Sequence, residues 1–195
     1  MGEEIDKIEK QELEFLNKLE KKYNRLSIRA LLGRPRYLWL WQKNISLKKR
    51  WEAILNNSSQ LRSLLTSRKC NDIARDMAIL DLGCGFGMYW PVFMQFGFRN
   101  FVGIDLFDLR KREKYFDAAK EFVTHFCEGC KVQLIMNDVR NIDNHKLIFD
   151  KFDIVLAVAT ASAKLGSTAI PKDLFNKISD KYGKKDCIRI YVKEI

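Results

Sequence analysis

The order of apolar and polar residues predicts alternating strands and helices along most of the chain. Five short apolar runs have the length and composition of buried strands, at residues 79–82, 101–104, 131–136, 152–158 and 187–192. Between them, apolar residues recur every three or four positions, which is typical of helices that cover a sheet. This alternation predicts an α/β fold in which a mostly parallel sheet has helices on both faces.

The helical pattern also precedes the first strand, where it predicts an N-terminal helical extension. Along this extension, Glu12 falls within the apolar stripe that Ile8 and Phe15 define. The segment from Asn56 to Ser59 is expected to weaken or split the second helix. The expected helices cover residues 3–23, 46–66, 88–97, 109–128 and 171–182, with a short turn or helix at 142–149. We expect residues 1–70 to form the extension and residues 71–195 to form the main domain.

A glycine-rich turn joins the first two strands of the main domain. Gly83, Gly85 and Gly87 follow the first strand directly, and Asp105 ends the second. Glycine has no Cβ, so it adopts positive φ and lets a ligand lie against the backbone. A carboxylate at the end of the second strand is placed to accept hydrogen bonds from ribose hydroxyls.

The turn reads Asp81-x-Gly83-x-Gly85-x-Gly87, and here the chain resembles the class I S-adenosylmethionine-dependent methyltransferases, a resemblance that extends from Ile79 to the last residue. It implies a Rossmann-like fold and S-adenosylmethionine as cofactor. It places Asp81 and the glycines beside the methionine part, Asp105 at the ribose and Asp138 at the adenine amino group. The implied cofactor-binding residues are Asp81, Gly83, Cys84, Gly85, Gly87, Asp105, Leu106, Asp138, Val139 and Ala157. A nicotinamide oxidoreductase is a remoter alternative, since Met88 stands where a dinucleotide fingerprint needs a small residue.

Several of these positions also have a purely structural interpretation. Asp138 follows Asn137 after the third strand, and Asn-Asp pairs favour turns without any ligand. Tyr89 and Trp90 flank the glycine turn, where they either line the cofactor pocket or pack into the core. Thr160, Ser162 and Lys164 follow the fourth strand, at the sheet edge where ligands of parallel sheets bind, so we expect them near the transferred methyl group.

A basic and aromatic segment runs from Lys21 to Trp51, with ten Lys or Arg residues and no Asp or Glu. Such a segment suits an anionic partner, because cations contact phosphates or carboxylates and aromatic rings stack on bases. Nucleic acid is therefore one predicted partner. Contact with a membrane surface through the run from Tyr37 to Trp41 is another. The alternative is that the aromatic residues pack the extension onto the main domain and the charges are merely solvated.

Composition and cysteine usage point to a cytoplasmic protein. The chain has 35 Lys or Arg against 25 Asp or Glu, a formal net charge of +10, and its first residues are acidic, unlike a signal peptide. No apolar run is long enough to cross a bilayer. Five scattered cysteines suit reduced thiols. His125, Cys127 and Cys130 fall short of the four ligands that a zinc site normally needs, so we expect no metal.

The expected function is methyl transfer to an unidentified acceptor, a small molecule or an anionic polymer. No catalytic residue stands out, because neither His125 nor His145 is near a strand end expected to face substrate. The alternatives are a catalytically silent cofactor-binding subunit and an RNA methyltransferase that uses the basic segment. The resemblance also implies a longer sheet than the five strands found, so we expect a truncated or minimal form, or an oligomer that covers the exposed edge.

Overall fold

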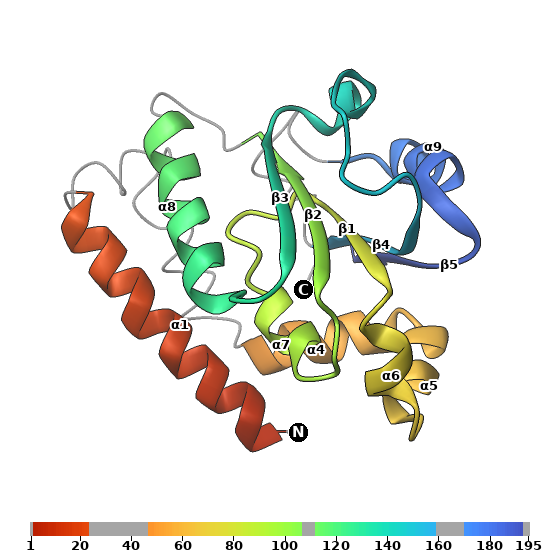
Figure 1. Cartoon of the computed structure of the whole chain (residues 1–195), viewed down its shortest axis with the longest axis horizontal. Coiled ribbons are helices and arrows are strands. Elements are labelled where there is room, and N and C mark those ends of the chain that lie inside the picture. The colour runs from red at the N-terminus through yellow and green to blue at the C-terminus, as the bar shows by residue number, and fades with distance from the viewer. Residues whose placement is uncertain (1, 24–46, 107–111, 159–169, 193–195) are drawn as a thin grey trace.

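A parallel five-stranded sheet forms the centre of the protein, in a computed structural model that describes residues 2–23, 47–106, 112–158 and 170–192 (Figure 1). The strands are β1 (Ala78–Leu82), β2 (Asn100–Asp105), β3 (Lys131–Met136), β4 (Phe152–Val158) and β5 (Gly183–Val192). Their order is β3-β2-β1-β4-β5, and each neighbouring pair is parallel. The chain therefore switches direction across the sheet between β1 and β4, where ligands of such sheets bind at the carboxyl edge.

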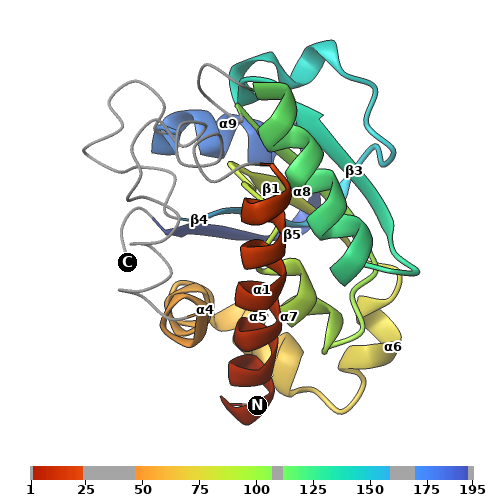
Figure 2. The same ribbon diagram turned by 90° about the vertical axis from the view of Figure 1, so that its left-hand side faces the viewer.

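Helices cover both faces of the sheet, as the sequence predicted. One face carries α1 (Gly2–Lys22), α4 (Leu47–Asn56), α7 (Trp90–Met94) and α8 (Arg112–Phe126), and Figure 2 shows α1 and α8 side by side across it. The opposite face carries η1 (Val139–Asn144) and α9 (Lys172–Tyr182). Two further helices, α5 (Ser59–Thr66) and α6 (Cys70–Ala74), connect α4 to β1.

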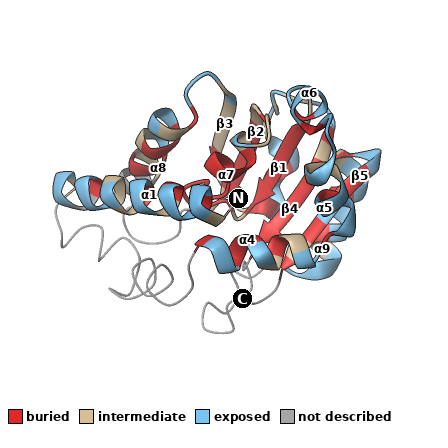
Figure 3. Cartoon of the chain, turned by 90° about the horizontal axis from the view of Figure 1, so that it is seen from below, coloured by how far each residue is buried: buried red, intermediate tan, exposed pale blue. Residues whose placement is uncertain are grey.

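Side chains alternate between the two faces along the central strands, because successive Cβ atoms of a strand point to opposite sides. On β1, Ile79 packs with the helices of the α1 face, whereas Leu80 and Leu82 pack with α9 and η1. Strand β1 and most of β4 are buried (Figure 3). The core thus consists of two apolar layers with the sheet between them.

The N-terminal extension packs directly against this core. Ile5 and Ile8 of α1, with Trp51 and Ile54 of α4, belong to the same buried cluster as Phe93 of α7. The Trp51 ring meets Phe93 edge to face at 4.9 Å. Packing of the extension onto the domain is therefore the observed role of Trp51, while the division of the chain at residue 70 stays a prediction.

The expected split of the second helix is confirmed, and it has a specific cause. Helix α4 ends at Asn56, and Ser58 caps the next helix by accepting a hydrogen bond from the Leu61 N–H at 3.1 Å. A serine in this position satisfies one of the N–H groups that a helix leaves unpaired at its start.

The strand predictions at 131–136 and 152–158 match β3 and β4, whereas several other boundaries were wrong. Helix α7 covers Trp90–Met94 rather than 88–97, because Pro91 starts it and Gly97, with φ of 97°, lies beyond its end. Strand β5 begins at Gly183, earlier than predicted, and its pairing with β4 is irregular near Phe152. The short helix η1 begins at Val139 and not at residue 142. Helix α6 was not predicted.

Candidate functional site

The glycine turn after β1 forms a tight loop at the carboxyl edge of the sheet. The N–H groups of Gly83 and Cys84 donate to the Ile104 carbonyl of β2, at 2.8 and 3.4 Å. The Gly87 N–H donates to the Cys84 carbonyl at 2.8 Å. All three predicted glycines have positive φ, of 74°, 53° and 71°. This confirms the conformational reason for glycine there, because other residues adopt that region only with strain.

Asp105 joins the end of β2 to the glycine loop. Its Oδ2 accepts a hydrogen bond from the Gly85 N–H at 3.0 Å, and its side chain is only partly buried. The predicted ribose ligand and the predicted loop therefore lie together at one edge. The contact also means that any change at Asp105 alters the loop as well as the carboxylate.

Asp81 lies beneath the loop and has a protein partner. It is buried, and its Oδ2 accepts a hydrogen bond from the Trp90 indole N–H at 2.9 Å. Burial raises the pKa of Asp81 to about 7; the Trp90 hydrogen bond opposes this rise and the charge of Asp105 adds to it. The resemblance implied a contact with methionine, but in this structure Asp81 binds the indole.

The Trp90 side chain fills the space beneath two glycines. It is fully buried and stacks on Phe101 of β2, with ring centroids 5.1 Å apart. A Cβ at Gly87 would lie 2.8 Å from the indole. A Cβ at Gly103 would lie 2.8 Å from the indole and 2.6 Å from the Cys84 sulfur. Glycine at position 87 thus accommodates a side chain of the protein itself, and of the two alternatives for Trp90, the structure shows core packing.

Cys84 and Leu106 lie next to this group. The Cys84 thiol is buried, and burial together with the charges of Asp81 and Asp105 raises its pKa well above the usual value. A thiol with a raised pKa is a poor nucleophile. Leu106 is partly buried directly after β2. Both remain predicted cofactor neighbours by position.

Asp138 has the turn role that the alternative interpretation described. Its side chain caps η1 by accepting from the Arg140 N–H at 2.9 Å, and it also pairs with the Arg140 guanidinium. This hydrogen bonding lowers the pKa of Asp138. Val139 and Ala157 are buried in the core layer of α9. A contact of these three residues with adenine or with the cofactor stays a prediction.

Three buried residues with polar groups lie close together beside the loop, and the sequence did not predict that they meet. Glu12 of α1 and Arg50 of α4 are 1% and 2% exposed, and Tyr89 lies just before α7. Arg50 interacts with both Glu12 and the Tyr89 hydroxyl. Burial raises the pKa of Glu12 well above its usual value, and the Arg50 charge opposes this. The available signal was Glu12 itself, a carboxylate within an apolar stripe.

The other candidate residues are partly outside the described ranges. Thr160, Ser162, Lys164 and the run from Tyr37 to Trp41 lie there, as does most of the basic segment. His125 stacks on Phe15 with ring centroids 4.2 Å apart. Within the described residues, no three His, Cys, Asp or Glu side chains are grouped as metal ligands would be, and the five cysteines are free thiols. No helix in the described ranges has the length and apolar character needed to span a bilayer.

No protein-family model matches the sequence, and no curated protein matches it significantly. Solved structures do match its fold. One is an S-adenosylmethionine-dependent methyltransferase from Thiobacillus denitrificans in complex with S-adenosylhomocysteine, at 17% identity and a TM-score of 0.46, covering 68% of this chain and 47% of that one. Another is the PRMT1 enzyme–prozyme complex of Trypanosoma brucei with the same ligand, at 18% identity and a TM-score of 0.47, covering 71% and 40%.

A third is a ribosomal protein L11 methylase from Lactobacillus delbrueckii, at 18% identity and a TM-score of 0.41, covering 68% of this chain and 58% of that one. This chain thus spans between 40% and 58% of the length of these three proteins. The parallel sheet of order β3-β2-β1-β4-β5, with helices on both faces, is itself the Rossmann-like arrangement that the sequence resemblance implied.

Proposed function

We propose that this chain binds S-adenosylmethionine at the carboxyl edge of its sheet and transfers the methyl group to an acceptor. The observation that carries the proposal is the contact between Asp105 and Gly85, which brings a partly exposed carboxylate against a loop of positive-φ glycines. A nucleoside with free ribose hydroxyls needs such a carboxylate, and its attached chain needs bare backbone beside it.

The residues present fit the proposed cofactor, and each has a separate role. Gly83 and Gly85 are partly exposed and supply the surface of the loop, whereas Gly87 is buried over Trp90. Asp105 would hold the ribose hydroxyls. Asp81 would act indirectly, because it holds the indole on which the loop rests. Asp138 is the position that the resemblance assigns to the adenine amino group, and in this structure it pairs with Arg140. To contact adenine, Asp138 would either keep this ion pair or replace it with a hydrogen bond to adenine.

The proposed reaction requires little acid–base catalysis from the protein. A sulfonium donor is already activated by its positive charge, so the cofactor supplies a methyl group ready for in-line displacement. The protein contributes alignment of the two reactants and exclusion of water. A general base is needed only for an acceptor that holds its proton at the working pH.

The acceptor is proposed to be anionic, either a small molecule or a polymer. The net charge of +10 supports this, and so do Lys48 and Lys49, which are exposed on the described part of the basic segment. RNA is the polymer that the basic and aromatic segment from Lys21 to Trp51 favours. A catalytically silent cofactor-binding subunit is the alternative from another functional class.

Calorimetric titration with S-adenosylhomocysteine tests the binding site. Asp105→Asn keeps an oxygen that accepts from the Gly85 N–H but removes the charge that holds the ribose. We expect it to weaken binding by about 1.5 to 3 kcal/mol, the value of a hydrogen bond to a charged group. Asp150→Asn, at an exposed site in the loop before β4, is the matched control and leaves the affinity unchanged. Equal affinity of Asp105→Asn and the wild type would contradict the proposed ribose contact.

A labelled-methyl assay tests transfer separately from binding. The purified chain is incubated with labelled cofactor and either RNA or a panel of small anionic acceptors. Methyl transfer to RNA, at a rate that falls as the salt concentration rises, favours RNA as the acceptor. The salt dependence arises because RNA binding displaces counterions. Binding of the cofactor without transfer to any acceptor favours the silent subunit.

A further inference from the structure

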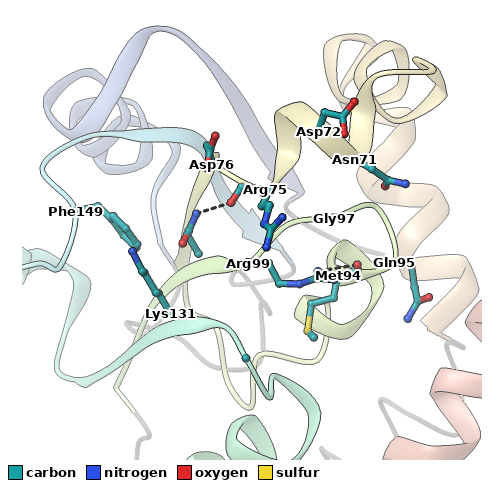
Figure 4. Close-up of a pocket in the computed structure, with 12 residues that line it drawn as sticks. Asn71, Asp72, Arg75, Asp76, Met94, Gln95, Gly97, Arg99, Lys131 and Phe149 are labelled. Atoms are coloured by element: carbon teal, nitrogen blue, oxygen red, sulfur yellow. Dashed lines mark hydrogen bonds between the residues drawn. The ribbon is translucent and has the colours of Figure 1, made fainter.

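A cavity of about 910 Å³ lies at the amino edge of the sheet, opposite the glycine loop (Figure 4). It is built from the residues around the starts of β1, β2 and β3, together with α6 and the turn after α7. Ligands of parallel sheets normally bind at the carboxyl edge, so this cavity is separate from the proposed cofactor site. Its volume is within the range of small-molecule sites.

Charged side chains of both signs line this cavity. Arg75, Arg99 and Lys131 supply three cations, and Asp72 and Asp76 supply two carboxylates. Within the described part of the chain, none of the five forms an ion pair with another residue. These opposite charges surround one open space and do not pair with one another. They therefore suit a ligand that carries an anionic group and also hydrogen-bond donors.

The cationic side of the cavity is fixed by the backbone. The Arg99 guanidinium donates through Nη1 to the carbonyls of Met94 and Phe98, at 2.9 and 2.6 Å, and Figure 4 shows the first of these bonds. The Lys131 N–H, at the start of β3, donates to the carbonyl of Arg99, the residue before β2, at 2.8 Å, so the two residues lie side by side. An arginine held in place loses less conformational entropy when it binds an oxyanion.

The acidic side is positioned in a similar way. The Asn100 side chain donates to the carbonyls of Arg75 and Met77, at 3.0 and 3.3 Å, which fixes the connection between α6 and β1. Asp76 lies in this connection, and Asp72 lies in α6 just before it. Phe149 lines the same cavity from the segment before β4 and offers an aromatic ring.

We propose that this cavity binds a nucleoside monophosphate. The phosphate lies against Arg75, Arg99 and Lys131, because guanidinium and ammonium groups are the preferred partners of phosphate oxygens. The ribose hydroxyls donate to the carboxylates of Asp72 and Asp76. The base lies against Phe149, since rings of any base stack on an aromatic side chain. A free amino acid would match the charges but would leave most of the volume unfilled.

Calorimetry on protein saturated with S-adenosylhomocysteine tests the site, since that ligand closes the proposed cofactor pocket to nucleotides. The probes are AMP, GMP, adenosine and inorganic phosphate. We expect AMP and GMP to bind with a stoichiometry of about one, and adenosine and phosphate to bind at least about tenfold more weakly. If S-adenosylhomocysteine does not bind, the same titrations on the unliganded protein still test the amino-edge cavity, because the variants below identify the site.

Variants of three residues that line the cavity, with an exposed cation outside it as control, separate this site from general attraction by a basic protein. Arg75→Gln and Lys131→Gln each weaken AMP by about tenfold, because each removes one charged contact to phosphate. Phe149→Leu weakens the binding of AMP but leaves the binding of inorganic phosphate unchanged. Arg68→Gln removes an exposed cation that does not line the cavity and leaves AMP within about twofold.

Four results would overturn the proposal. They are no AMP binding at millimolar concentration, equal binding of AMP and inorganic phosphate, an equal loss with Arg68→Gln and Arg75→Gln, and displacement of AMP by S-adenosylhomocysteine. A short oligonucleotide with a terminal phosphate, titrated in parallel, distinguishes a free nucleotide from the end of a strand. Binding of either, with the expected response to the Arg75 and Lys131 variants, supports the site.

Discussion

The indole N–H of Trp90 donates to the buried carboxylate of Asp81 at 2.9 Å, directly beneath the glycine loop. This bond links β1 to the start of α7 and supports the loop from below. It also places an ionisable group in a site from which water is excluded, so the loop rests on a residue that titrates near neutral pH. The stability of the protein should therefore depend on pH.

The first prediction concerns the pH dependence of unfolding. The pKa of Asp81 is about 7 in the folded protein against 3.8 for the unperturbed group. The folded state therefore holds a proton that the unfolded state has lost throughout that window, so stability is greatest below it and falls as pH rises to about 7. The loss from this group is roughly 1.4 kcal/mol for each pH unit within the window.

Asp81→Asn tests this, because it keeps an acceptor for the indole and removes the titration. We expect the variant to be more stable than the wild type at pH 8 and the difference to shrink towards pH 5. Urea denaturation followed by tryptophan fluorescence measures it. Glu12, whose pKa is also raised, contributes equally to both proteins and cancels in the difference. Parallel pH profiles for the two proteins would contradict the prediction.

The second prediction separates backbone strain from side-chain conflict at Gly87. Gly87 and Gly129 both have positive φ, of 71° and 75°. A Cβ at Gly129 meets nothing within 4 Å, whereas one at Gly87 meets the Trp90 ring at 2.8 Å. Alanine at either position costs about 1 to 2 kcal/mol for the left-handed conformation. Gly87→Ala should cost roughly a further 1 to 3 kcal/mol for overpacking.

Thermal or urea unfolding of the two variants measures that difference. Gly129→Ala is the matched control because it carries the strain alone. If the two variants lose the same stability, the indole moves aside at no free-energy cost. The close packing of Gly87 against Trp90 then does not contribute to stability.

The third prediction concerns the buried pair of Glu12 and Arg50. Arg50→Met removes the cation that lowers the pKa of the buried Glu12 carboxyl, so this pKa rises further and we expect the variant to be less stable than the wild type, with a loss that grows as pH rises. Glu12→Leu combined with Arg50→Met replaces the pair with apolar side chains and should recover most of that loss. A double-mutant cycle in urea measures the coupling. Additive effects of the two substitutions would show that the pair is not coupled.

The fourth prediction concerns the start of α5. Ser58→Ala removes the oxygen that accepts from the Leu61 N–H, and loss of a helix cap costs about 1 kcal/mol. Ser59→Ala, at the exposed next position, changes no cap and should be close to neutral. Equal effects of the two substitutions on the unfolding midpoint would exclude a capping role for Ser58.

Sequence periodicity determined the layers of this protein and the place of its loop. The boundaries of β3 and β4 follow from apolar runs, and the positive φ of Gly83, Gly85 and Gly87 follows from a glycine run between two such strands. These features depend on neighbours along the chain. A strand or a turn is specified by residues within a few positions, so the sequence alone contains the information.

Tertiary structure decided what the polar groups contact. Asp81 and Trp90 meet because the glycine loop folds back, and Arg50 reaches Tyr89 because α4 packs across the sheet. Gly103 is required by the indole and by Cys84, which no pattern near it indicates. Periodicity shows which side of an element faces the core, but the partner of a buried charge depends on how separate elements pack, and that packing is fixed only when the chain has folded.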